Sequence, residues 1–454
     1  MRRIAGDVGM TRIAAVALLL ALCAAPSVAV GPVVQERSLA NGATLLVSEQ
    51  RTLPIVTVMA ILDAGSRRDP ADLPGLANLT AESLTEGAGG RTANEIAAAI
   101  EFIGGSLSAS AGVDYTTLTL TVLRKDLDTV LELFSKVLLD PAFPDEEVAR
   151  AADATLAALR SAEDDPTDIA NKAFSRAFYG SHPYAHPVEG DAESVKRIRR
   201  ADVERFYRAH YGAGRAAVVV VGDVATAEIA ESLATALRGW TAREVEPLHA
   251  AVIGAAEAQR LDIDRPVTQA SIVLGHGGIA RSNPDYETLQ VMNYVLGGGG
   301  FSSRLMEKIR NQAGLVYGVS SYFSGGELPG SFRIMMQTKN ESVGRAIELA
   351  RAELRGVRDD GITEAELEDA KRYLTGSFPL GLDSNGKIAT FIAQSWFFGL
   401  GLDAAEQYLR KIEAVTLEDV ARVAREHLQP DTLLTVVVAD LAQVGATDPG
   451  PPPK

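Results

Sequence analysis

Two residues in the second half of the sequence, Arg310 and Tyr317, have side chains that can stabilise a developing oxyanion. A tyrosine hydroxyl can donate a hydrogen bond to such an oxygen, and an arginine can hold a carbonyl group and support its charge. Taken singly, Arg310 fits a solvated helix arginine and Tyr317 fits a strand core residue. Their occurrence together, shortly after a glycine run, favours a functional pair.

The glycine run comprises Gly297, Gly298, Gly299 and Gly300. It does not match a phosphate-binding loop, because no Gly-Lys-Ser or Gly-Lys-Thr follows it. It does not match a dinucleotide-binding turn either, because the segment before it has a helical pattern. Glycine lets a backbone approach a ligand closely. We therefore predict that these four glycines bind substrate.

The first half contains Gly65-Ser66-Arg67-Arg68-Asp69 and, shortly after it, Pro74-Gly75-Leu76-Ala77. These motifs resemble the pitrilysin/insulinase family of zinc metallopeptidases, in the subgroup that includes the mitochondrial processing peptidases. In active members, His-x-x-Glu-His follows Gly-Leu-Ala on a helix. Its two histidines hold zinc and its glutamate activates the metal-bound water. The resemblance covers nearly all of residues 33–442.

The zinc motif is degenerate in this sequence. The motif positions hold Asn78, Ala81 and Glu82, and the family's third zinc ligand corresponds to Ala158. Alanine can neither bind a metal nor move a proton, asparagine is a weak zinc ligand, and one glutamate cannot hold the ion alone. The chain is therefore expected to carry no metal and no other cofactor.

Two histidines elsewhere, His182 and His186, have the spacing of two ligands on one helix face. Pro183 and Pro187 break any helix between them, so a metal role is not favoured there.

The resemblance implies a role for Arg310 and Tyr317. In active members an arginine and a tyrosine at this spacing reach across a chamber to the scissile peptide. We therefore expect this chain to be the non-catalytic subunit of a heteromeric zinc endopeptidase, with both residues acting in trans. Zinc is expected in a homologous partner subunit that carries His-x-x-Glu-His.

The implied substrate is an extended peptide or an unfolded protein segment, bound as an added strand. Residues 106–111 resemble the edge strand that receives peptide in active members. Zinc-lacking subunits of processing peptidases also carry a glycine-rich loop near the position of Gly297–Gly300.

Composition excludes one class of function. The 454 residues have a formal net charge of −15, whereas a nucleic-acid binder needs a basic face to meet phosphates. Hydrophobic residues make up 46% of the chain and charged residues 23%, which is typical of folded globular proteins.

The first 29 residues are predicted to be a secretory signal peptide. Arg2, Arg3 and Arg12 give a basic start, an apolar run too short to span a bilayer follows, and small residues precede Val30. The alternative is an N-terminal membrane anchor. The only cysteine lies inside this segment, so the mature chain would have no disulfides. We expect a periplasmic or otherwise exported protein without a membrane span in its mature form.

The rest of the chain has the pattern of a duplication. The same order of strand-like and helix-like segments occurs twice, with matched helix starts at Pro144 and Thr363. We predict an α+β fold of two homologous domains, residues 30–245 and 246–445, followed by a disordered tail, residues 446–454. The resemblance implies that each domain is a mostly antiparallel sheet with helices packed on one side.

Two other functions remain open at this stage. The chain could be a scaffold or peptide-binding protein with no proteolytic role, like the zinc-lacking core subunits of respiratory complexes. It could also be an enzyme with different chemistry, although no Ser/His/Asp or Cys/His set stands out. Whether a homodimer also forms is not determined by the sequence.

Overall fold

The computed structural model describes residues 31–243 and 258–445. The predicted signal peptide, the C-terminal tail and most of the predicted domain junction lie outside these residues. Within the described residues, no helix combines the length and the apolarity that a membrane crossing requires.

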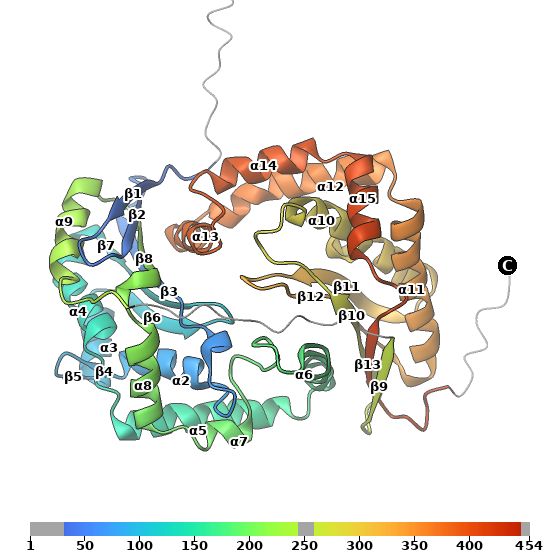
Figure 1. Ribbon diagram of the computed structural model, residues 1–454, viewed down its shortest axis with the longest axis horizontal. Helices are drawn as coiled ribbons and strands as arrows, with labels where there is room; N and C mark the ends of the chain where they lie inside the picture. The colour runs from blue at the N-terminus through green and yellow to red at the C-terminus, as the bar shows by residue number, and fades with distance from the viewer. Residues whose placement is uncertain (1–30, 244–257, 446–454) are drawn as a thin grey trace, which may run out of the picture.

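The first half of the chain is built on a six-stranded sheet (Figure 1). Its strands, in spatial order, are β1 (Gln35–Ser38), β2 (Thr44–Glu49), β8 (Ala216–Gly222), β3 (Ile55–Leu62), β7 (Thr116–Leu123) and β6 (Ser106–Ala111). All neighbouring pairs are antiparallel except β2 and β8. A small hairpin of β4 (Gly87–Ala88) and β5 (Arg91–Thr92) lies outside this sheet.

The second half repeats the arrangement with a five-stranded sheet. Its spatial order is β11 (Val316–Ser324), β12 (Ser331–Lys339), β10 (Gln269–Gly277), β13 (Leu434–Ala439) and β9 (Gln259–Asp264). Its one parallel pair, β13 and β9, corresponds to the parallel pair β8 and β2 of the first sheet. Strand for strand, this order matches β6-β7-β3-β8-β2 of the first sheet, so the predicted α+β fold with two homologous, mostly antiparallel sheets is confirmed.

Helices of the same half cover one face of each sheet. In the first half they are α2 (Leu76–Glu82), α3 (Ala93–Phe102), α4 (Leu127–Leu139), α5 (Asp145–Ala162), α7 (Ala192–Val195), α8 (Arg200–His210) and α9 (Thr226–Ala236). In the second half they are α10 (Tyr286–Asn293), α11 (Val343–Asp360), α12 (Glu364–Ser377), α14 (Ala404–Ala414) and α15 (Leu417–His427).

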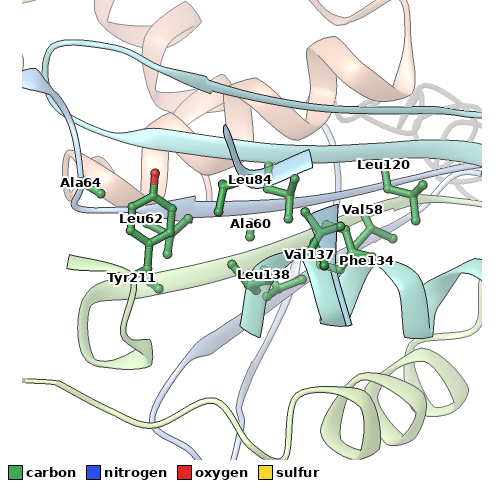
Figure 2. Close-up of a cluster of buried hydrophobic side chains, with 14 of the residues drawn as sticks. Val58, Ala60, Leu62, Ala64, Leu84, Leu120, Phe134, Val137, Leu138 and Tyr211 are labelled. Atoms are coloured by element: carbon green, nitrogen blue, oxygen red, sulfur yellow. The ribbon is translucent and has the colours of Figure 1, made fainter. Parts of the chain in front are cut away.

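Alternation along the strands builds the first core. In β7, Leu118, Leu120 and Val122 are buried, and the residues between them are only partly buried. Figure 2 shows Leu120 meeting strand residues such as Val58 and the α4 residues Phe134 and Val137. Each such fully buried side chain contributes about 1.5–3 kcal/mol.

Each sheet also receives one helix from the opposite half on its other face (Figure 1). Helix α13 (Asn385–Phe397) packs on β3 and β8 of the first sheet, and α6 (Pro166–Tyr179) packs on β10 and β13 of the second. The two helices start 219 residues apart (385 − 166), the same separation as α5 and α12 (364 − 145), so the exchange is part of the duplication. The sequence predicted helices on one side only, and this reciprocal exchange ties the halves together.

The exchanged helices fit closely. Phe174 of α6 is fully buried, and a Cβ on Gly275 of β10 would lie 2.5 Å from its ring, so only glycine leaves room for this ring. From α13, Gln394 donates to the Tyr115 hydroxyl at 2.7 Å and Asn385 Nδ2 donates to the Ile55 carbonyl at 3.0 Å.

A buried ion cluster reinforces the junction of the halves. Asp63, at the end of β3, accepts from Arg67 at 2.6 Å, Arg68 at 2.7 Å and Arg215 at 2.9 Å. Glu327, in the turn between β11 and β12, forms ion pairs with Arg67 at 2.6 Å and Arg215 at 2.5 Å. A carboxylate from the second half thus sits against two arginines of the first.

His276 makes the stability of the second half sensitive to acid. Its ring is buried on β10 and stacks on Phe332 at 4.7 Å, and burial lowers its pKa from 6.5 to about 4. The unfolded chain then binds the proton more readily than the folded chain. The associated stability is complete above pH 6.5 and is lost as the pH falls towards 4, at a cost of about 2 kcal/mol between pH 7.5 and pH 5.

This pH dependence can be measured by urea unfolding of the wild type and His276→Leu at both pH values. The loss of unfolding free energy on acidification should be smaller by about 2 kcal/mol in the variant. Comparing each protein with itself cancels the packing cost of the substitution. Equal acid losses in both proteins would show that His276 does not titrate as described.

Candidate functional site

The degenerate zinc positions lie on one short helix, α2. It begins after Gly75, whose positive φ of +95° suits glycine, and Asp69 accepts from the Gly75 and Ala77 N–H groups at 2.7 Å each. Ala81 is fully buried, whereas the other two positions face away from the core. Asn78 Nδ2 donates to Glu82 Oε1 at 3.1 Å, so these side chains share a helix face as the spacing predicts.

Glu82 also meets the helix on which the third ligand was placed. Thr155 of α5 donates to Glu82 Oε2 at 3.5 Å, and Ala158 stands one turn further along α5. Burial raises the pKa of Glu82, against the opposing effect of the hydrogen bonds from Asn78 and Thr155. The four positions therefore offer one carboxylate, already bonded to an amide, and two methyl groups. This donor set does not fit zinc, which takes three or four nitrogen, sulfur or oxygen ligands from a protein.

The expected result of metal analysis follows from this geometry. After mild dialysis, the purified chain should contain well under one zinc per molecule by plasma mass spectrometry. A zinc enzyme carried through the same dialysis controls for stripping of bound metal. One tightly held zinc per chain would overturn this reading of Asn78, Ala81, Glu82 and Ala158.

A large cavity lies between the two halves beside α5. It encloses about 790 Å³ and is lined from the first half by residues that include Ala158 and Tyr184, and from the second by residues that include Tyr322 and Arg333. At its wall, the Tyr184 hydroxyl donates to Asp114 Oδ1 at 2.5 Å and accepts from the Leu328 N–H at 3.1 Å. Burial raises the pKa of Asp114.

Sequence reasoning missed most of this cavity. Asp114 and Arg333 belong to no motif, and they come together with Tyr184 only through the packing of the halves. His186 and Glu189 also line the cavity, and their His-x-x-Glu spacing was overlooked in the sequence. They lie in the loop between α6 and α7, where His186 Nδ1 is 3.0 Å from the Pro187 carbonyl oxygen, so they do not form a helical metal motif.

The structure brings Arg310 and Tyr317 together. Arg310 lies in a π-helical segment, Met306–Gln312, and its guanidinium is 5.9 Å from the centre of the Tyr317 ring. Tyr317 follows the first residue of β11, where the register with β12 shifts between Val316 and Val319. This bulge turns the side chain outward, and 89% of Tyr317 is exposed.

The four glycines of the run do not share one environment. A Cβ on Gly297, Gly298 or Gly299 would lie within 2.4–2.7 Å of Ser321, Asn293 or Tyr294, so these three glycines allow close packing within the chain. Gly300 has a φ of +58° and open space around its Cα. Of the four, only Gly300 lines a cavity described here, and the substrate-binding role of the run stays a prediction.

This second cavity, of about 470 Å³, is lined by residues that include Gly300, Phe301, Tyr317, Met335 and Gln337. It lies further along the strands β11 and β12, whose Tyr322 and Arg333 line the larger cavity. Ala158 and Tyr317 thus line different cavities, and strands β11 and β12 contribute residues to both.

Comparisons with known proteins match this architecture. A family model described as "Insulinase (Peptidase family M16)" matches residues 45–192, and one described as "Peptidase M16 inactive domain" matches residues 197–374. A Streptomyces coelicolor protein named an uncharacterized zinc protease is 29% identical over 379 residues, 82% of each chain. A Mycobacterium tuberculosis protein with the same description is 30% identical over 411 residues, 86% of this chain and 93% of that protein.

A solved structure also matches the fold of this chain. The crystal structure of a peptidase M16 inactive domain from Pseudomonas fluorescens superposes with a TM-score of 0.85 at 32% identity, covering 90% of this chain and 98% of that one. Both halves match the family, and Asn78, Ala81 and Glu82 stand where the family's zinc motif has its two histidines and its glutamate. The chain therefore belongs to the pitrilysin/insulinase family, peptidase family M16, as a member of the inactive type.

Proposed function

We propose that this chain is the non-catalytic subunit of a heteromeric, exported zinc endopeptidase. One observation carries the proposal: Arg310 and Tyr317 lie together at the surface of a chain whose zinc positions hold Asn78, Ala81 and Glu82. Zinc is proposed to be held by a homologous partner subunit with His-x-x-Glu-His.

In the assembled enzyme, each member of the pair has a distinct task. The Tyr317 hydroxyl donates a hydrogen bond to the oxygen of the scissile carbonyl as negative charge develops on it. The Arg310 guanidinium holds a peptide carbonyl in the ground state and supports the same charge. Most donors of the Arg310 guanidinium are available for this task, because the one hydrogen bond that its side chain makes among the described residues is to Asn311 Oδ1 at 3.3 Å.

The substrate class proposed is an extended peptide or an unfolded segment. Strand β6 is an edge of the first sheet, as expected, and it carries only small or apolar residues. It has no charge or proline to repel an added strand, and Ser106, Ser108 and Ser110 are exposed. These features support β6 as the strand that pairs with peptide.

The first 29 residues are the basis for proposing that the protein is exported. The mature chain should start near Val30 and be found outside the cytoplasm, because the basic start and short apolar run are typical of a cleaved signal. N-terminal sequencing of protein from the fractionated native host measures both properties. An intact N-terminus in the cytosolic fraction would contradict the proposal.

Co-purification tests the partnership. The full-length chain, tagged at its C-terminus and expressed at its native level, should bring with it a homologue carrying His-x-x-Glu-His in near-equal amount by quantitative mass spectrometry. An untagged strain controls for adventitious binding. Recovery of the chain alone, or only with copies of itself, would favour the scaffold alternative.

A further inference from the structure

The cation of Arg310 is not paired with a carboxylate in the part of the chain described. Glu307, one helical turn earlier, is the natural ion-pair partner on a helix. Both of its oxygens are taken instead, by Asn311 Nδ2 at 2.8 Å and Gln312 Nε2 at 3.0 Å. Arg304, two residues before the π-helical segment, behaves differently, because it binds both oxygens of Glu366 at 2.7 Å.

An aromatic ring takes the place of the missing carboxylate. The guanidinium of Arg310 lies over the ring of Phe301, 4.9 Å from its centre, closer than the Tyr317 ring at 5.9 Å. Phe301 is 71% exposed, so its ring contributes little to the core. A cation over an aromatic face is attracted to it without using its N–H groups, whereas a carboxylate would occupy them and compete with a peptide carbonyl.

The backbone around Phe301 is built to hold this ring in place. Gly300 supplies the positive φ before it, and both the N–H and the hydroxyl of Ser303 donate to the Gly300 carbonyl, at 3.1 and 2.7 Å. Ser303 itself is fully buried. The exposed ring therefore projects from a fixed turn, at the same cavity as Tyr317.

We propose that Phe301 is a positioning residue for Arg310: its exposed ring holds the guanidinium beside Tyr317, at the cavity lined by Gly300 and Tyr317, and leaves for substrate the N–H donors that Asn311 does not bind. The assignment rests on the proposed function. Phe301 does not itself take part in the chemistry.

The first test uses the chain alone and does not depend on a substrate. Arg310 is modified with phenylglyoxal, and its rate is followed by peptide mass spectrometry relative to Arg304. Phe301→Leu should raise the relative rate about two- to five-fold, the size expected for loss of an exposed cation–π contact. Phe301→Tyr should restore the wild-type rate. An unchanged rate in Phe301→Leu would overturn the proposal.

The second test measures binding of a fluorescein-labelled unfolded protein, reduced and carboxymethylated α-lactalbumin, to the full chain. Phe301→Leu should weaken binding about two- to five-fold at an unchanged melting temperature, and Phe301→Tyr should bind like the wild type. Phe102→Leu, which alters a 90% exposed ring on α3, should bind normally and is the matched control. Equal binding by wild type and Phe301→Leu would refute the inference.

The experiments distinguish a failure of the proposed function from a failure of the inference about Phe301. If the wild type does not bind the unfolded protein while the phenylglyoxal rates respond as expected, the proposed substrate class is wrong and the Phe301 contact stands. If the wild type binds and Phe301→Leu changes neither readout, the proposed function stands and Phe301 has no positioning role.

Discussion

Replacing Tyr317 by phenylalanine should lower the turnover of the assembled enzyme about 100- to 1000-fold, the usual effect of losing one oxyanion donor. The substitution removes only a hydroxyl, which makes no hydrogen bond to the described residues and belongs to an 89% exposed side chain. Folding and assembly should therefore survive. The quantity to measure is turnover per assembled complex, using complexes isolated by size-exclusion chromatography.

Tyr373→Phe is the matched control for this substitution. Tyr373 is 56% exposed on α12, where its ring packs near Tyr294, and its hydroxyl should not affect turnover. If Tyr317→Phe complexes turn over at the wild-type rate, the shared-site mechanism is wrong. A loss that follows the amount of complex formed would assign Tyr317 a role in assembly instead.

Replacing Asp63 by asparagine should lower the free energy of unfolding by about 3–5 kcal/mol, as expected when a buried charge partner is removed. Asp63 has a fully buried side chain and bonds to Arg67, Arg68 and Arg215. Burial by itself raises the pKa of Asp63, but hydrogen bonding and charge from these arginines hold it below its ordinary value. Loss of the negative charge leaves three clustered cations with too little compensation.

Urea unfolding at neutral pH measures this effect, and Asp383→Asn provides the control. Asp383 pairs with Lys387 at 2.9 Å, but its side chain is 55% exposed, so its loss should change stability by less than about 0.5 kcal/mol. Similar effects of the two substitutions would show that the buried cluster does not stabilise the junction. Asp63 also binds Arg67 and Arg215, the two arginines that pair with Glu327 of the second half. The variant should therefore weaken the contact between the two halves before their cores unfold.

The order of elements was predictable because periodicity reports burial. Alternation in β7 and the buried valines of β8 identify strands, and repetition of the order along the chain identifies the duplication. The exchange of α6 and α13 was not predictable. An apolar helix face shows that the helix is buried, but not which sheet buries it, and Phe174 and Phe397 meet sheets of the opposite half.

The candidate site likewise has some features that the sequence predicts and others that it does not. Asn78 and Glu82 are i,i+4 on a helix, so their contact followed from spacing alone. The approach of Arg310 to Tyr317 depends on a π-helical segment and a bulge, which no residue pattern announces. The role of Phe301 was missed because one exposed aromatic residue carries no motif. The packing role of Gly297 depends on Ser321, which lies on a later strand.

The central claim is that this chain completes an active site in trans, and titration of the two subunits tests it most directly. The zinc-bearing homologue from the same organism is held at constant concentration while this chain is added, and cleavage of an unfolded fluorescent protein is followed. We expect no cleavage by this chain alone, weak cleavage by the homologue alone, and a rate that rises to a plateau at one chain per homologue. A rate that does not change as the chain is added, although the two proteins form a complex, would contradict the account.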